Sequence, residues 1–421
     1  MEIEIFDYGM NGEGVGKING KIALISDALV GEVVEAEIVK ENKNFCVANV
    51  KSVIKKSQQR QIPPCPYFFD CGGCDLQHMK YEEQLKFKQM LVQKTIKKIT
   101  GVDYQVSNTV PSENVFNYRN KLSINFKDGK SGFFKEGSKD IVEIKNCMLA
   151  SEKINKIYEI FAKNIKNNAK FVKNLVIREI NNQILVGVVV NKAFDLLPIY
   201  EIINKEIVNV GMFQILNTRK DSVVLSGKVS HIAGIKEINI ENFGLNYSVD
   251  LLGFHQTNED IQNKIYEKVL EFISPNSVVL NGFSGQGLLS AIIAKKAHQV
   301  YGIEINESSH KSAENLKIVN KVNNLTNICG DFYKKFDKIK KNINTIVLDP
   351  SKKGCGRDTM CAIIGVENII YISCNPIALA KDLRELLPFY EIQDVVPFDM
   401  FPNTKSVETL VKLKLKEKKW F

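Results

Sequence analysis

A cysteine that directly follows an apolar, β-branched run is the first feature of this sequence that could do chemistry. In "ENIIYISCNPIALAKDL", the run from Ile369 to Ile372 favours a buried strand, and Pro376 cannot continue a β-ladder. Cys374 therefore stands where the strand ends. A thiolate in a polar crevice is a nucleophile, whereas most free cysteines are small buried hydrophobic residues. The elements around Cys374 must decide between these two interpretations.

Four other cysteines have a spacing that could hold a metal centre. They are Cys65, Cys71 and Cys74 in "CPYFFDCGGC", and Cys147 in "IVEIKNC". A glycine pair within the first stretch lets the backbone fold around one centre, and four thiolates suit either zinc or an iron–sulfur cluster. The chain has nine cysteines, an odd number that argues against a disulfide framework. Unrelated buried thiols are the competing interpretation.

A βαβ unit supplies the element pattern that would position a ligand. The stretch "SVVLNGFSGQGLLSAIIAKKAHQVYGIEINESSHKSAENLKIVN" predicts a strand, a glycine-rich turn, a helix, a strand and a helix. Gly285 and Gly287 allow close approach of a ligand to the turn, and Glu304 ends the second strand where an acid can bind a ribose diol. Ser290 occupies the place of the third glycine of a dinucleotide fingerprint. NAD is still possible at this step.

Two further strands end in residues that could do chemistry. The strand in "INTIVLDP" ends at Asp349, and the next one ends at Cys374. Parallel strands present their functional side chains at their carboxyl ends, so Glu304, Asp349 and Cys374 should line one crevice. This position favours a reactive thiol over a buried one.

The whole chain is predicted to be a multidomain α/β protein with three parts. Residues 1–57 contain about five short strands punctuated by glycines, which is typical of a small OB-like β-barrel. Residues 58–249 form a central α+β domain that carries the four-cysteine cluster. Residues 250–421 form a Rossmann-like domain. At 421 residues, the chain is too long for a single core.

Composition narrows the class of protein. The chain is 44% hydrophobic and 25% charged, as in soluble globular proteins, and its net charge of +9 would suit a polyanionic partner. The start "MEIEIFDYG" lacks the pattern of a secretory signal, and no apolar run approaches the length of a membrane span. We therefore expect a cytoplasmic protein without a membrane partner.

Six motifs, in order, resemble those of a known enzyme family. They are "FHQTNED", "NGFSGQG", "GIEIN", "LDPSKKGC", "ISCNP" and "DMFPNTKSVETL", and they resemble the S-adenosylmethionine-dependent RNA uracil-5-methyltransferases. The amino-terminal segment looks like the RNA-binding TRAM domain. The four cysteines resemble the iron–sulfur ligands of the 23S ribosomal RNA branch. The resemblance implies an enzyme with one 4Fe-4S cluster that methylates carbon 5 of a uridine in RNA, with 23S rRNA as the expected target. We expect the enzyme to be a monomer.

The resemblance also implies roles for individual residues. Cys374 would add to carbon 6 of uracil, which turns carbon 5 into a nucleophile, and Glu408 in "SVETL" would later remove the proton from carbon 5. The resemblance places Arg119 and Asn120 in a stretch near the RNA. The residues that match the cofactor-binding positions of the family are Gln256, Phe283, Glu304 and Asp349.

Some positions depart from the family pattern, and two other functions compete. The departures are Asn281 for Asp, Ser284 for Cys, Ser351 and Lys352 for Pro and Arg, and Ser406 for His. The competing functions are a transfer-RNA uridine-5-methyltransferase and a non-catalytic RNA-binding factor in ribosome assembly. Retention of both Cys374 and Glu408 argues against the non-catalytic factor. A DNA cytosine methyltransferase would place a proline before its cysteine, whereas here Pro376 follows it.

Overall fold

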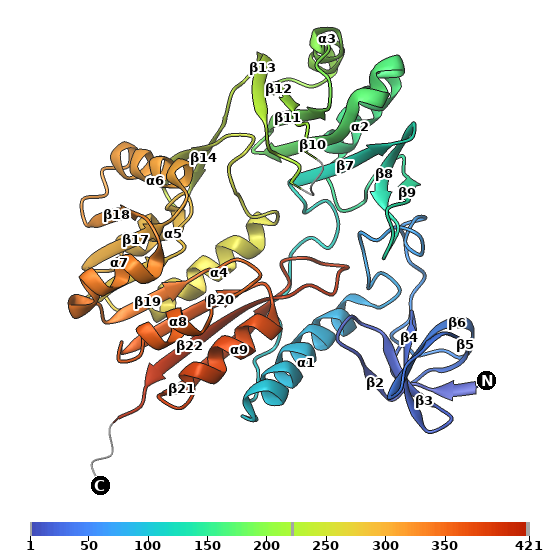
Figure 1. The fold of residues 1–421 in the computed structure, drawn as a ribbon, viewed down its shortest axis with the longest axis horizontal. Helices are drawn as coiled ribbons and strands as arrows, with labels where there is room; N and C mark the ends of the chain where they lie inside the picture. Colours follow the sequence, from blue (N-terminus) through green and yellow to red (C-terminus); the bar gives the residue numbers. More distant parts are fainter. Residues whose placement is uncertain (1, 220–222, 418–421) are drawn as a thin grey trace.

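The structure, a computed structural model, describes residues 2–219 and 223–417. Figure 1 shows the amino-terminal strands (blue) and the carboxyl-terminal sheet (orange and red) on either side of helix α1 (Tyr81–Thr100), with a second large sheet (green) above them. The chain therefore folds into three sheet-containing parts that meet around the segment containing α1.

The amino-terminal part is a strongly curved six-stranded sheet in the order β1-β5-β6-β4-β3-β2. The chain just after β1 also bonds to β3, because the Phe6 N–H donates to the Val15 carbonyl at 3.0 Å. This contact brings the two sides of the sheet together around a small aliphatic core that includes Ile3, Ile25 and Val34. The strands are β1 (Glu2–Glu4), β2 (Asp7–Tyr8), β3 (Gly14–Ile18), β4 (Lys21–Ser26), β5 (Val33–Glu41) and β6 (Phe45–Lys55).

The middle part is a seven-stranded mixed sheet in the order β13-β12-β11-β10-β7-β8-β9. Its apolar face packs against α2 and α3 in a core of its own. A hairpin then leads toward the carboxyl-terminal sheet. The elements are β7 (Lys121–Lys127), β8 (Lys130–Phe134), β9 (Ile141–Glu143), α2 (Glu152–Asn164), η1 (Lys166–Phe171), β10 (Val172–Ile180), β11 (Gln183–Val190), α3 (Leu197–Glu206), β12 (Val210–Leu216), β13 (Lys228–Gly234), β14 (Ile238–Asn242) and β15 (Leu245–Val249).

The carboxyl-terminal sheet is Rossmann-like, as predicted. Its order is β18-β17-β16-β19-β20-β22-β21, so the strand order reverses between β16 and β19. Open α/β sheets bind ligands beyond the carboxyl ends of the strands at such a reversal. The strands are β16 (Val278–Gly282), β17 (Gln299–Glu304), β18 (Leu325–Cys329), β19 (Thr345–Leu348), β20 (Asn368–Ser373), β21 (Tyr390–Phe398) and β22 (Glu408–Leu415). The helices are α4 (Glu259–Phe272), α5 (Leu288–Ala294), α6 (Glu307–Val319), α7 (Phe332–Ile339), η2 (Lys340–Asn342), α8 (Arg357–Ala362) and α9 (Pro376–Leu386).

Strand β22 runs opposite to its neighbours and carries its first residue to the functional edge. It pairs antiparallel with β20, with Ser373 opposite Thr409. The start of β22 therefore lies beside the end of β20. As a result, Glu408, the first residue of β22, comes next to Cys374, although the two are far apart in the sequence.

Helix α1 belongs to the core of the carboxyl-terminal sheet. Its buried side chains Phe87, Leu91 and Ile96 share one apolar cluster with residues of α9 and β22. Beyond α1, residues 107–110 add to the edge of β21, where the Val110 N–H donates to the Pro397 carbonyl at 2.8 Å. The sheet is thus completed by chain from before residue 120, while the domain boundaries at 57 and 249 stay predictions.

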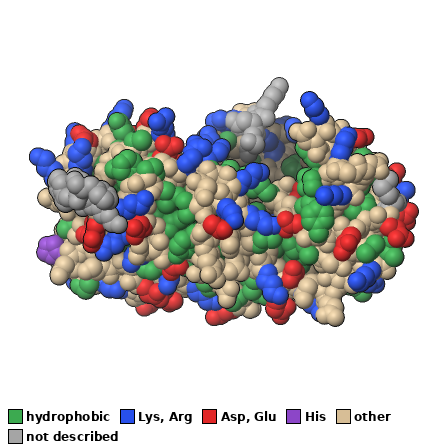
Figure 2. All heavy atoms as spheres, turned by 90° about the horizontal axis from the view of Figure 1, so that it is seen from below, with side chains coloured by type: hydrophobic (Ala, Val, Ile, Leu, Met, Phe, Trp, Pro, Cys, Tyr) green, Lys and Arg blue, Asp and Glu red, His purple; other side chains and the backbone are tan. Residues whose placement is uncertain are grey.

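Helix length and surface charge indicate whether the protein could contact a membrane or a polyanion. In the described residues, no helix is both long and apolar enough to span a bilayer. Figure 2 shows lysine and arginine side chains over the face seen from below, with acidic side chains between them. On this face the positive charge is dispersed rather than gathered into one patch.

Candidate functional site

A cavity of about 960 Å³ opens at the carboxyl ends of β16, β19 and β20. It is large enough for a nucleotide-sized ligand. Five of the six residues predicted for catalysis and cofactor binding line it: Gln256, Phe283, Asp349, Cys374 and Glu408. Glycines of the cysteine-rich segment and Lys405 line the same cavity, so segments far apart in the sequence contribute to one site.

The local structure explains why "SCNP" presents a cysteine. Strand β20 ends at Ser373, and α9 begins at Pro376, which suits the first helical position because it lacks an N–H. The Asn375 side chain accepts hydrogen bonds from the amides of the first turn of α9. Its Nδ2 donates to the Lys352 carbonyl at 2.9 Å. Cys374 is left half-buried between strand and helix, facing the cavity.

The electrostatics around Cys374 oppose its ionisation in the free protein. Burial raises the pKa of the thiol to about 11, and the nearby negative charges of Glu408 and Asp349 add to this effect. The positive charge of Lys352 lowers the same pKa. The pKa of the Cys374 thiol therefore has to fall when the substrates bind before the thiol can act as a nucleophile.

Two carboxyl groups beside Cys374 also have raised pKa values. Glu408 is 4% exposed, and burial raises its pKa well above the ordinary value; Asp349 raises it further and Lys352 opposes the shift. Desolvation at the cavity wall raises the pKa of Asp349 to about 7. Such shifts are typical of acid–base groups in active sites. Lys352, a departure from the family pattern, is the cation that acts on both Cys374 and Glu408.

The glycine-rich turn is organised by Glu304 and Phe283. Phe283 has a left-handed backbone (φ 60°), and its ring stacks on Phe332 with centroids 5.4 Å apart. The Glu304 carboxylate accepts hydrogen bonds from the N–H groups of Gly285 (2.9 Å) and Asn306 (2.7 Å). Glu304 is not among the residues that line the cavity. The structure therefore places Glu304 as a support of the turn, and its predicted contact with the cofactor stays a prediction.

The segment that carries Gln256 is held by the middle sheet. The Asn120 Nδ2 donates to the Gln256 carbonyl at 2.9 Å. The buried Arg178 of β10 donates to the carbonyls of Asp250 (2.8 Å) and Gly253 (2.6 Å). Arg119 lines the cavity, and its buried Nε has no partner. Asn120 thus positions the Gln256 segment, while Arg119 offers a donor to a ligand.

Besides Arg119 Nε, four buried polar atoms of residues that line the cavity lack a hydrogen-bond partner. They are Tyr247 Oη, Thr257 Oγ1, Gln262 Nε2 and Asn281 Oδ1. Buried polar groups are normally satisfied, so these atoms fit the donors and acceptors of a polar ligand. The sequence analysis missed Thr257 and Gln262. A signal for Gln262 was available, because it is a polar residue on the buried, otherwise apolar face of α4.

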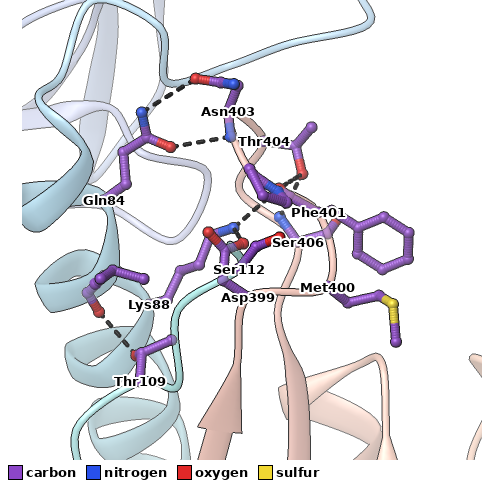
Figure 3. Close-up of polar contacts among 12 residues, drawn as sticks. Gln84, Lys88, Thr109, Ser112, Asp399, Met400, Phe401, Asn403, Thr404 and Ser406 are labelled. Carbon is purple, nitrogen blue, oxygen red and sulfur yellow. Dashed lines mark hydrogen bonds and ion pairs between the residues drawn. The ribbon is translucent and has the colours of Figure 1, made fainter. Parts of the chain in front are cut away.

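The loop between β21 and β22, residues 399–407, leads directly into Glu408 and is called here the 399–407 loop. Figure 3 shows that Gln84 and Lys88 of α1 point toward it. Lys88 and Asp399 form a fully buried ion pair, and the Lys88 Nζ also donates to the Phe401 carbonyl at 3.0 Å. The Gln84 Oε1 accepts from the Asn403 N–H at 2.9 Å. The path of the chain into Glu408 is therefore set by α1.

The four cysteines predicted to bind a metal lie near one another. Burial raises the pKa of Cys74 to about 12 and also raises the pKa values of Cys71 and Cys147. Negative charge on Cys65 adds to each of these shifts. However, no three His, Cys, Asp or Glu side chains within the described ranges are close enough to hold a metal ion. The predicted metal site is therefore not confirmed.

Sequence comparison decides the family. Residues 80–416 match the family described as tRNA (Uracil-5-)-methyltransferase, and residues 1–51 match the TRAM domain. The chain belongs to the tRNA (uracil-5-)-methyltransferase family. It is an RNA methyltransferase that depends on S-adenosylmethionine, as the sequence resemblance implied. The 23S branch and the iron–sulfur cluster are finer points that the match does not decide.

Individual relatives agree with this assignment. A Clostridium tetani protein is 34% identical over 436 residues, covering 97% of this chain and 94% of its own length. A Clostridium acetobutylicum protein is 32% identical and covers 99% and 97%. Both are named uncharacterized RNA methyltransferases.

A solved structure shares the whole fold. It is the Pyrococcus abyssi tRNA (uracil-54, C5)-methyltransferase in complex with S-adenosyl-L-homocysteine. The TM-score is 0.79 at 24% identity, with 98% of this chain and 100% of that chain covered. At this identity the likeness concerns the fold alone.

The raised pKa of Cys374 predicts a pH dependence. Without substrates, modification of Cys374 by iodoacetamide should accelerate about tenfold per pH unit between about pH 7 and 10, because only the thiolate reacts. Glu408→Gln should shift this profile to lower pH by removing a nearby negative charge. Mass spectrometry of the Cys374 peptide measures the rate. Glu391→Gln, which changes an exposed carboxylate on β21, is the matched control. A modification rate that reaches a plateau near pH 8 in the protein without substitutions would contradict the raised pKa.

Proposed function

We propose that this enzyme transfers a methyl group to carbon 5 of a uridine in 23S ribosomal RNA. The observation that carries the proposal is that Cys374 and Glu408, the thiol and the carboxylate that this chemistry needs, share one cavity. The four-cysteine pattern supports ribosomal RNA, because the sequence resemblance links that pattern to the ribosomal branch. Transfer RNA is the competing substrate, since the family description names it.

In the first step, Cys374 acts as the nucleophile. Its Sγ forms a bond to carbon 6 of uracil, and the electrons of the carbon 5–carbon 6 double bond move to the carbon 4 oxygen as an enolate. Lys352 favours the thiolate that must attack, because its positive charge lowers the pKa of Cys374. Carbon 5 thereby becomes nucleophilic enough to accept a methyl group.

In the last step, Glu408 acts as the base. Once carbon 5 carries a methyl group, it still holds a proton that must leave. Glu408 removes this proton, the double bond forms again, and the bond between carbon 6 and the Cys374 sulfur breaks. A raised pKa makes the ionised Glu408 a stronger base than an exposed carboxylate.

The residues around the glycine-rich turn fit the methyl donor. When bound, S-adenosylmethionine supplies a methyl group on a positively charged sulfur. Asn281 and Gln262 offer unpartnered polar atoms, and an added Cβ at Gly285 would meet no atom within 4 Å, which leaves its backbone open to a ligand. Gln256 and Asp349 would hold the polar end of the donor, and the Phe283 ring would pack against it.

The RNA must present a single unstacked base to this cavity. A base inside folded RNA has to be flipped out before a thiol can reach its carbon 6. Arg119, with its unpartnered Nε, lies on the wall where it can donate to the flipped nucleotide. The TRAM barrel, residues 1–51, would hold the neighbouring strand.

The two steps predict different failures for two variants. Glu408→Gln should attack and methylate but not release its product, leaving protein joined to RNA that carries a methyl group. Cys374→Ala should form no adduct. A denaturing gel with labelled RNA and labelled S-adenosylmethionine separates these outcomes, because only the stalled species carries both labels in the protein band.

Retained turnover in Cys374→Ala would contradict the mechanism. If Cys374 only filled space, that variant would lose no more than roughly 1 kcal/mol of stability and keep its activity.

The choice of RNA predicts a modification pattern in cells. Disruption of the gene should remove 5-methyluridine from a 23S rRNA position and leave transfer-RNA 5-methyluridine unchanged. Nucleoside mass spectrometry of the separated RNAs measures both. Restoration by the unaltered gene, but not by Cys374→Ala, is the control; loss from transfer RNA alone would identify transfer RNA as the substrate.

We further propose that Cys65, Cys71, Cys74 and Cys147 hold a 4Fe-4S cluster. Burial and neighbouring thiolates raise the pKa values of Cys71, Cys74 and Cys147, and a cationic centre would stabilise the four cysteines as thiolates. Four cysteine thiolates are a ligand set that a 4Fe-4S cluster accepts. Anaerobically purified protein should be brown and contain about four irons per chain. Colourless protein with one zinc per chain would contradict this proposal.

A further inference from the structure

The 399–407 loop is held largely by residues that precede the middle sheet. Glu136 and Asn258 add one contact each, to Lys405 Nζ (3.6 Å) and to the Met400 carbonyl (3.4 Å). Strand β22 begins at Glu408, which pairs with Phe398 of β21, so the β-ladder holds the chain from Glu408 onward but not the residues before it. On the other side, the position of Glu408 depends on the loop. A general base must lie within hydrogen-bond reach of the proton that it removes, so any freedom in this loop would affect the base directly.

The first anchor is the ion pair between Lys88 and Asp399. Both side chains are 0% exposed. The Lys88 Nζ also donates to the Phe401 carbonyl at 3.0 Å. Since a buried charge without its partner is costly, the start of the loop cannot move away from α1.

The second anchor is the contact between Gln84 and Asn403. The Asn403 N–H donates to the Gln84 Oε1 at 2.9 Å, and the Gln84 Nε2 donates to the Asn403 Oδ1 at 3.3 Å. Asn403 has a left-handed backbone (φ 67°), and its Nδ2 donates to the Val115 carbonyl at 2.7 Å. The turn in the middle of the loop is therefore held in an uncommon conformation from outside.

The third anchor is Asp75, next to the cysteine-rich turn. The N–H groups of Asp75 and Leu76 both donate to the Asn403 carbonyl at 3.0 Å. The Asp75 carboxylate accepts from the Lys405 N–H at 3.1 Å and pairs with the Lys405 Nζ at 2.9 Å. Lys405, which this anchor holds, lies three residues before Glu408.

We propose that Asp75, Gln84 and Lys88 are positioning residues for proton removal by Glu408. This inference rests on the proposed function. The three residues act through the 399–407 loop: they fix its start, its turn and its end, and so hold the Glu408 carboxylate where it can reach carbon 5. Loosening them should slow the release step, while nucleophilic attack by Cys374, which is carried by β20 and α9, should continue.

The experiment compares Gln84→Ala and Asp75→Ala with Gln89→Ala. Gln89 is a matched control, because it lies on the same helix and its Nε2 donates to the Val106 carbonyl at 2.8 Å, away from the loop. In the two test variants, kcat should fall by roughly tenfold, and the methylated protein–RNA adduct should become the major steady-state species. The KM for S-adenosylmethionine should stay within about twofold, because the anchors do not touch the glycine-rich turn. Gln89→Ala should behave as the unmodified protein does.

A merely structural role predicts another result. Gln84→Ala or Asp75→Ala would then lose activity in proportion to loss of folded protein, without adduct, and either that result or normal turnover would overturn the inference. Hydrogen exchange of the 399–408 peptide gives a readout that needs no activity: exchange should be faster in both test variants than in Gln89→Ala. If Gln84→Ala does not fold, the more accessible Asp75→Ala decides. If Glu408→Gln itself gives no methylated adduct, the proposed function has failed, which is a distinct outcome.

Discussion

The buried ion pair between Lys88 and Asp399 is the constraint on which the catalytic edge depends. It joins residues 311 positions apart, and both side chains are fully buried. Burial lowers the pKa of Lys88, and the negative charge of Asp399 opposes that shift. The ion pair therefore offsets part of the cost of burying the Lys88 charge. Removing one partner of such a pair typically costs about 3–5 kcal/mol, because the other charge is left buried. The pair therefore permits one placement of α1 against the end of β21, and the path of the chain into Glu408 follows from it.

Acidic groups that repel one another when ionised lie close together at the catalytic edge. Cys374, Asp349 and Glu408 are three acids in one cavity, opposed by the positive charge of Lys352. Folded protein keeps the Asp349 proton up to about pH 7, whereas an unfolded chain releases it near the ordinary value of 3.8. The fold therefore loses stability as the pH rises through that interval. Stability given up at one edge of the sheet is typical of sites that must hold reactive groups.

Strand ends were predictable from the sequence, whereas contacts between distant segments were not. The glycine-rich turn, Asp349 and Cys374 follow β-branched runs, and parallel strands bring such ends together. Glu408 has no such local signal and is indicated only by the family resemblance, because its position depends on the antiparallel register of β22 with β20. Glu304 differs from these residues, because its carboxylate accepts a hydrogen bond from the glycine-rich turn and does not line the cavity; its predicted contact with the cofactor stays a prediction. The role of α1 depends on a pairing with Asp399 that no local pattern reveals.

The added edge formed by residues 107–110 has a consequence for how the enzyme is made. These residues and α1 leave the ribosome long before β21 and β22, since Gln84 and its partner Asn403 are 319 positions apart. Until the distant strands are synthesised, these residues lack their native hydrogen-bond partners. Contacts between segments so far apart in the sequence give the fold a high contact order, and such contacts form slowly. A nascent chain that has already completed the glycine-rich turn and Asp349 would still lack the base beside its thiol. Because of this order of synthesis, the active site is complete only after α1 and residues 107–110 have packed against β21 and β22.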